Sequence, residues 1–256
     1  MGMINARRPL VIGNWKMQPA SLSLTTKLGK ELKKKLGTER EVVVVVAPPF
    51  VYLDSIRTIV HGAKGLALGA QDAFPEKPGA HTSQIAIPML RDLAVQYIIL
   101  GHSERRALGE TGEVVNKKLI AVLKEGLTGV VCVGEHTRDH AGHYLSLIEE
   151  QVRQALAGVS KAKLERVVIA YEPLWAIGTG ATATPADVHE MRLFIERVLS
   201  DLYGRTYAQR VSILYGGSVN AKNARELFIE GTIDGFLVGG ASLKADEFTG
   251  IVRAVR

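Results

Sequence analysis

The stretch Val42-Val43-Val44-Val45-Val46-Ala47 (VVVVVA) decides the fold class of this chain. Consecutive β-branched residues favour a strand, and the lack of polar alternation indicates a strand that is buried on both faces. Such strands are typical of parallel sheets that helices cover. The run therefore predicts an α/β protein.

Seven further apolar runs recur along the chain at intervals of roughly 30 residues. They are Leu10 to Gly13, Leu66 to Gln71, Tyr97 to Gly101, Val130 to Gly134, Val167 to Tyr171, Ser212 to Tyr215 and Phe236 to Gly239. Apolar residues at helical spacing lie between them, in residues 22–36, 114–123, 145–156, 188–199 and 224–228. Ser21 and Thr184-Pro185 are typical helix starts for the first and fourth of these stripes.

Eight strands that alternate with helices predict parallel βαβ units. A closed barrel and an open doubly wound sheet both fit this pattern, and the count of eight favours the barrel. No linker or shift in composition divides the 256 residues. We therefore predict a single (β/α)8 barrel domain over residues 1–256.

Composition sets limits on location and partners. The net charge of +6 and the pI near 9.4 favour anionic partners, either nucleic acid or a small phosphorylated substrate. The longest cationic run, Lys33 to Lys35, ends a predicted helix, where cations suit the helix dipole. We therefore expect no nucleic-acid site there.

The single cysteine, Cys132, cannot form an internal disulfide or a cysteine-based zinc site. Residues 1–8 hold no apolar stretch, and the longest apolar run, Val42 to Pro49, is too short to span a bilayer. We expect a cytoplasmic protein without a membrane segment.

Polar residues and glycines follow several predicted strands, where the active site of an α/β barrel forms. They are Asn14 and Lys16, His102, Glu172, Gly216-Gly217 and Gly239-Gly240. A carboxylate such as Glu172 can remove a proton from a carbon beside a carbonyl. His102, Asn14 and Lys16 can donate hydrogen bonds to the resulting enediolate. The glycine pairs let backbone N–H groups approach a phosphate.

Each of these residues taken singly also has a structural interpretation, and only their convergence on one rim favours catalysis. The segment from Pro173 to Ala183 is interpreted as a lid over that rim. Gly178 to Ala183 matches the dinucleotide pattern G-x-G-x-x-A, but five residues separate it from Glu172 at the strand end. We interpret that match as accidental because the pattern requires its first glycine directly after a strand.

Five motifs resemble the triosephosphate isomerase family, in the family's order, between about Pro9 and Ala241. They are Asn14-Trp-Lys-Met17, Leu100-Gly-His-Ser-Glu-Arg-Arg106, Ala170-Tyr-Glu-Pro-Leu-Trp-Ala-Ile-Gly-Thr-Gly180, Tyr215-Gly-Gly-Ser-Val219 and Leu237-Val-Gly-Gly-Ala241. The resemblance implies a glycolytic and gluconeogenic isomerase that uses no metal or cofactor. Its substrates would be dihydroxyacetone phosphate and glyceraldehyde 3-phosphate.

The resemblance also implies a role for each matching residue. Glu172 would be the base, His102 a neutral electrophile, Lys16 a positive charge at the same oxygen, and Asn14 an orienting group. The phosphate would be held by Gly178, Ser218, Gly239 and Gly240. Glu104 would accompany Lys16. Pro173 and Trp175 would lie at the start of the lid segment. Tyr215 and Ser218 would hold the lid in its closed position.

The family resemblance further implies a homodimer, built by a loop from Asp72 to Ala86 that enters the neighbouring subunit. Thr82 matches the family in this loop, but Gln84 replaces its usual carboxylate. The ion pair expected with Arg105 would become a neutral hydrogen bond. Three alternative functions are an isomerase of a longer ketose phosphate, a non-catalytic phosphate-binding barrel and an NAD-dependent oxidoreductase.

Overall fold

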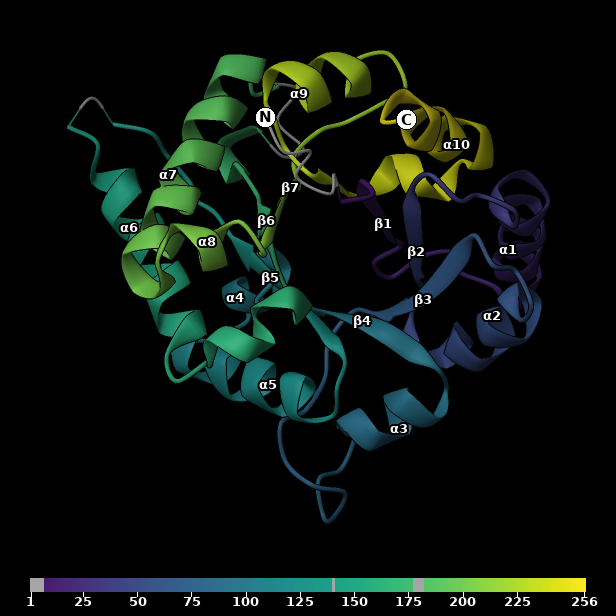
Figure 1. Cartoon of the computed structure of the whole chain (residues 1–256). Coiled ribbons are helices and arrows are strands. Elements are labelled where there is room, and N and C mark those ends of the chain that lie inside the picture. The colour runs from purple at the N-terminus through teal and green to yellow at the C-terminus, as the bar shows by residue number, and fades with distance from the viewer. Residues whose placement is uncertain (1–6, 140, 177–181) are drawn as a thin grey trace.

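The computed structural model describes residues 7–139, 141–176 and 182–256, and its centre is a closed barrel of eight parallel strands (Figure 1). The strands are β1 Leu10–Asn14, β2 Val43–Ala47, β3 Leu66–Ala70, β4 Val95–Leu100, β5 Thr128–Val133, β6 Val167–Tyr171, β7 Ser212–Tyr215 and β8 Gly235–Val238. Each strand pairs with its neighbours in sequence, and β8 pairs with β1. The predicted barrel is therefore confirmed, and the open sheet is excluded.

Helices surround the barrel on its outside (Figure 1). They are α1 Leu22–Leu36, α2 Leu53–Val60, α3 Ile87–Asp92, α4 Ser103–Ala107, α5 Gly112–Lys124, α6 His143–Leu156, α7 Pro185–Tyr203, α8 Arg205–Ala208, α9 Ala224–Glu230 and α10 Ala245–Ala254. Short 3-10 turns lie at η1 Phe50–Tyr52, η2 Lys161–Arg166, η3 Leu174–Ala176 and η4 Gly240–Leu243.

The five helices predicted from periodicity are α1, α5, α6, α7 and α9. Ser21 caps α1 by accepting a hydrogen bond from the Leu24 amide, and Thr184 forms a capping box with Asp187 at the start of α7. The sequence pattern did not single out α2, α3, α4, α8 and α10. Three of these have six residues or fewer, which is too short to display a helical period.

The strands are mostly apolar because each one contributes to two packed layers. Leu10, Ile12 and Val45 belong to the core inside the barrel. Val11 and Val44, which alternate with them, belong to the core between the strands and the helices. Side chains of a strand point alternately to opposite faces, so burial on both faces removes the polar alternation.

Barrel closure depends on a glycine at the start of β8. Gly235 has a φ of +145° and lies opposite Leu10 of β1. A Cβ atom there would lie 1.9 Å from the Leu10 carbonyl oxygen, so a side chain would separate the two strands. This closure brings the segment after β8 beside the segment after β1.

No helix in the described ranges is long and apolar enough to cross a membrane.

Candidate active site

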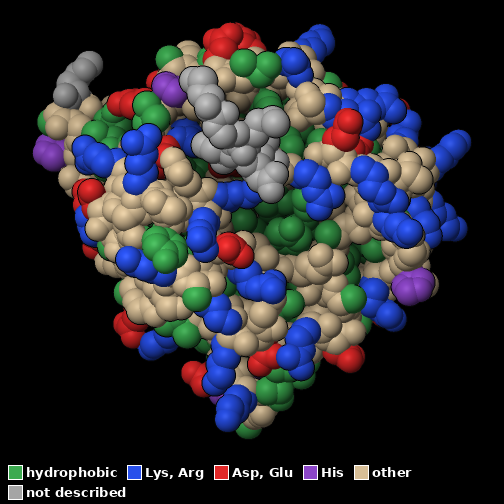
Figure 2. Space-filling model, in the orientation of Figure 1, with side chains coloured by type: hydrophobic (Ala, Val, Ile, Leu, Met, Phe, Trp, Pro, Cys, Tyr) green, Lys and Arg blue, Asp and Glu red, His purple; other side chains and the backbone are tan. Residues whose placement is uncertain are grey.

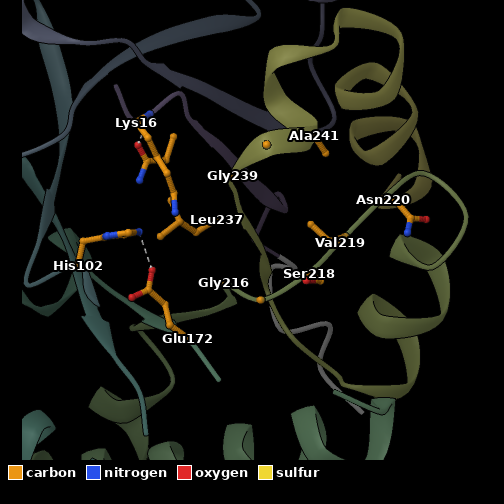
Figure 3. A pocket seen from close by; sticks show the side chains of 13 residues that line it. Lys16, His102, Glu172, Gly216, Ser218, Val219, Asn220, Leu237, Gly239 and Ala241 are labelled. Carbon is orange, nitrogen blue, oxygen red and sulfur yellow. Dashed lines mark hydrogen bonds and ion pairs between the residues drawn. The ribbon is translucent and has the colours of Figure 1, made fainter. Parts of the chain in front are cut away.

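Side chains that follow five different strands line one cavity of about 270 Å³ at the carboxyl ends of the strands (Figure 3). Its lining consists of Asn14, Lys16, His102, Glu172, Gly216, Gly217, Ser218, Val219, Asn220, Leu237, Gly239, Gly240 and Ala241. Every strand-end residue proposed from the sequence is among them. The parallel barrel explains this convergence, because all strands end on the same face.

Glu172 follows β6 and is buried, with 2% of its surface exposed. One carboxylate oxygen, Oε1, lies 3.1 Å from Nε2 of His102 (Figure 3). The other, Oε2, accepts a hydrogen bond of 3.1 Å from the backbone amide of Ser103. Gly216 permits this position, because a Cβ there would lie 2.9 Å from Cγ of Glu172. The carboxylate is therefore fixed at the cavity wall and faces the imidazole.

The hydrogen bonds of His102 assign its tautomer. This residue is the N-cap of α4, and its Nδ1 accepts a hydrogen bond of 3.2 Å from the Glu104 amide. An Nδ1 that accepts cannot carry a proton, so the ring is neutral and its hydrogen is on Nε2. Nε2 is the atom that faces Glu172 and the cavity. His102 therefore presents a hydrogen-bond donor to the cavity.

Lys16 reaches the cavity from a strained backbone. Its φ is +54°, which is uncommon for a residue with a side chain. Its amide donates to Oδ1 of Asn14, and its carbonyl accepts from the side chain of Gln71. Its Nζ forms an ion pair of 2.7 Å with Glu104. Burial opposes ionisation of Glu104, but the Lys16 contact lowers the pKa of that carboxyl below its ordinary value. A local strain of this kind is characteristic of functional sites.

The opposite wall is made of backbone and small side chains from the segments after β7 and β8 (Figure 3). A Cβ on Gly240 would meet no atom within 4 Å, so its backbone is open to the cavity. The hydroxyl of Ser218 donates to the Ala176 carbonyl at the start of the proposed lid. Burial raises the pKa of Tyr215 to about 12, so this residue keeps its phenolic proton. Gly178, also proposed from the sequence, lies outside the described residues.

Of the residues proposed for the subunit interface, Asp72 and Arg105 lie near the same rim. Arg105 forms an ion pair of 3.1 Å with Asp72 of its own chain, and burial raises the pKa of Asp72. Thr82 and Gln84 are exposed. A second cavity of about 270 Å³ adjoins Asp72, the first residue of the loop, and the catalytic side chains. Its lining is Asn14, Lys16, Phe50, Gln71, Asp72, His102, Glu104, Arg105 and Leu108.

Sequence reasoning missed four residues that support the site. Gln71 follows β3 and Glu135 follows β5, two strand ends at which the sequence suggested no functional residue. Reading all eight strand ends would have found both. Ser103 acts through its backbone amide, so the type of its side chain does not indicate this role. Arg138 lies in the connection after β5, and only the tertiary structure reveals its contacts.

Comparison with known proteins gives the family. The family model described as triosephosphate isomerase matches residues 9–255. A protein of Roseiflexus castenholzii named triosephosphate isomerase is 48% identical over 248 residues, which cover 96% of this chain and 97% of that protein. Proteins of the same name from Thermoanaerobacter pseudethanolicus and Moorella thermoacetica are each 46% identical over 96% of this chain, with 99% and 98% of their own lengths covered. The chain belongs to the triosephosphate isomerase family.

Proposed function

We propose that this protein interconverts dihydroxyacetone phosphate and D-glyceraldehyde 3-phosphate, in glycolysis and gluconeogenesis and in the cytoplasm. One observation carries the proposal. A buried carboxylate, Glu172, faces the Nε2–H of a neutral imidazole, His102, in a cavity that Lys16 also lines. The reaction needs a base for a C–H proton and donors for an oxygen that becomes negative.

Glu172 is the base in this proposal. With substrate bound, it takes the proton from the carbon beside the carbonyl and returns it to the neighbouring carbon, while the hydroxyl proton of the substrate passes from one substrate oxygen to the other. The substrate oxygens replace Glu172 as acceptors for Nε2–H of His102. Lys16 adds positive charge near the same oxygens, and Asn14 orients them. Because these donors are already held in place, they stabilise the enediolate without reorganisation during the reaction.

The wall of Ser218, Gly239 and Gly240 binds the substrate phosphate, together with Gly178 from the segment outside the described residues. Backbone N–H groups of glycines can approach an anion closely, because no side chain intervenes. The cavity of about 270 Å³ lies below the roughly 300–1,000 Å³ typical of larger ligands. This size favours a triose phosphate over a longer ketose phosphate.

We further propose a homodimer through the loop from Asp72 to Ala86. The cavity that Asp72, Glu104 and Arg105 help to line supports this proposal, because a loop of a second subunit seated there would contact the catalytic rim. Such a contact would stabilise the positions of Lys16 and Asn14, and activity would then depend on association.

An activity assay with the purified chain tests the function. Glyceraldehyde 3-phosphate is supplied without added metal or nucleotide, and dihydroxyacetone phosphate is measured by a coupling enzyme. We expect rapid conversion in both directions. A longer ketose phosphate serves as the comparison substrate. No turnover of either triose phosphate by folded dimer would contradict the proposal, and nicotinamide-dependent turnover would favour an oxidoreductase.

A further inference from the structure

A charged cluster outside the cavity supports the segment that carries Glu172. Its centre is Arg138, which lies between β5 and α6 and has 18% of its side chain exposed. The guanidinium lies over two aromatic rings, 5.1 Å from the centroid of Tyr144 and 5.3 Å from that of Trp175. A planar cation that contacts two rings has little freedom to move.

The guanidinium of Arg138 contacts three separate elements. Nε donates to Oε1 of Glu135 at 3.0 Å, and Nη2 donates to the hydroxyl of Tyr171, also at 3.0 Å. Nη1 lies 3.0 Å from Asp187 and 3.1 Å from Glu190, both on α7. One side chain therefore joins the segment after β5, the end of β6 and the helix that follows the proposed lid.

Glu135 extends these contacts to both sides of the proposed base. It is buried, and its Oε1 accepts a hydrogen bond of 2.7 Å from Tyr171 and one of 2.9 Å from Nε1 of Trp175. Its backbone carbonyl accepts from the amide of Leu174 at 3.0 Å. Tyr171 directly precedes Glu172, and Leu174 follows two residues later. The backbone on each side of Glu172 is therefore attached to the same carboxylate residue.

Arg138 supplies the positive charge of this cluster. Among the described residues, it is the only cation within ion-pair distance of Glu135, Asp187 and Glu190. Burial lowers its pKa, but Tyr171 and Glu135 more than offset that effect and raise the pKa above its ordinary value. Burial and the nearby Glu135 raise the pKa of Tyr171, so its hydroxyl keeps the proton it donates. Without Arg138, three carboxylates would repel one another beside β6.

We propose that Arg138 is a positioning residue for Glu172, which it holds at the cavity wall through Tyr171 and Glu135. This inference rests on the proposed function, because it assumes that Glu172 is the base. Arg138 does not line the cavity, so it acts on the geometry of the reaction and not on substrate binding. A displacement of a reacting group by about 1 Å costs roughly a hundredfold in rate.

The test compares Arg138→Ala with Arg192→Ala. Arg192 is a matched control, because its side chain is 23% exposed and it also forms an ion pair, with Glu196 on the same helix. We expect Arg138→Ala to lower kcat by roughly 10- to 100-fold and to leave KM within about threefold. Arg192→Ala should change kcat by less than about twofold, even if it lowers the melting temperature comparably.

Two further measurements separate positioning from a loss of stability. Free guanidinium at about 10–50 mM should restore part of kcat in Arg138→Ala, because the cation can occupy the space that the side chain leaves beside the two rings. Urea at the same concentration matches its size without its charge, and it should restore nothing. Tyr171→Phe removes only the hydroxyl that contacts both Glu135 and Arg138. It should therefore lower kcat by a smaller factor than Arg138→Ala does. This variant provides the test if Arg138→Ala does not fold.

The outcomes distinguish this inference from the proposed function. Wild-type protein without triose phosphate turnover would overturn both. Active wild-type protein with unchanged kcat in folded Arg138→Ala, or in Tyr171→Phe if the first variant is unfolded, would overturn only the positioning role. An equal loss of kcat in Arg192→Ala, or equal rescue by urea, would overturn it as well.

Discussion

The two walls of the cavity are built in opposite ways. The wall after β1, β4 and β6 presents charged and polar side chains, and each of these is held by at least one hydrogen bond or ion pair. The wall after β7 and β8 presents glycine backbone together with the uncharged side chains of Ser218, Val219, Asn220, Leu237 and Ala241. The difference teaches that the first wall is suited to chemistry and the second to binding. Substitutions in the first should lower kcat, and substitutions in the second should raise KM unless they displace Glu172.

The largest effect is expected at Glu172. Glu172→Gln preserves the shape of the side chain and removes the base, so kcat should fall by roughly three orders of magnitude or more. Steady-state kinetics measures the loss, and circular dichroism establishes that the variant is folded. Near-normal activity would show that Glu172 is not the base.

A smaller loss is expected at His102. His102→Leu removes the Nε2–H donor from the cavity, and loss of one such donor costs roughly 10²–10³ in kcat. KM should change much less, because the donor acts on charge that develops during the reaction. An increase in KM at constant kcat would instead show that His102 contributes to substrate binding and not to the chemical step.

Two glycines in one wall offer a sharper contrast. A Cβ at position 216 would lie 2.9 Å from Cγ of Glu172, whereas one at position 240 would meet no protein atom. Gly216→Ala should therefore displace the base and lower kcat by roughly tenfold to a hundredfold. Gly240→Ala should leave kcat nearly unchanged and raise KM by roughly tenfold. If both variants change the same kinetic constant, contact with Glu172 does not distinguish the roles of these two glycines.

The smallest effect is expected at the proposed interface. Arg105 already pairs with Asp72 of its own chain, so a new carboxylate at position 84 competes with an existing partner. Gln84→Glu should strengthen the dimer by no more than about 1 kcal/mol, the usual limit for exposed ion pairs. Sedimentation at low concentration measures the change. A fully active monomer would disprove the interface, and an unchanged dimerisation constant would mean that residue 84 and Arg105 do not meet.

The site could be located from the sequence because its chemistry lies at strand ends. Asn14, His102 and Glu172 each follow an apolar run, and parallel strands bring those ends to one face. The sequence did not indicate that the Ser103 amide holds Glu172, or that the Glu104 amide fixes the tautomer of His102. Those contacts use backbone groups, which are the same in every residue, so only their placement in space gives them a role.

The sequence by itself determined the alternation of strands and helices, the burial of the strands on both faces and the residue types of the catalytic wall. Apolar runs such as residues 42–47 favour burial between two layers, and their number favours a barrel, but only the pairing of β8 with β1 in space closes it. Only the tertiary structure decided which partners each polar side chain takes. Arg105 with Asp72, and Arg138 with Asp187, join segments whose separation in the chain carries no signal of contact. Periodicity reports burial along one element, whereas a hydrogen bond depends on atoms that the closed barrel brings together.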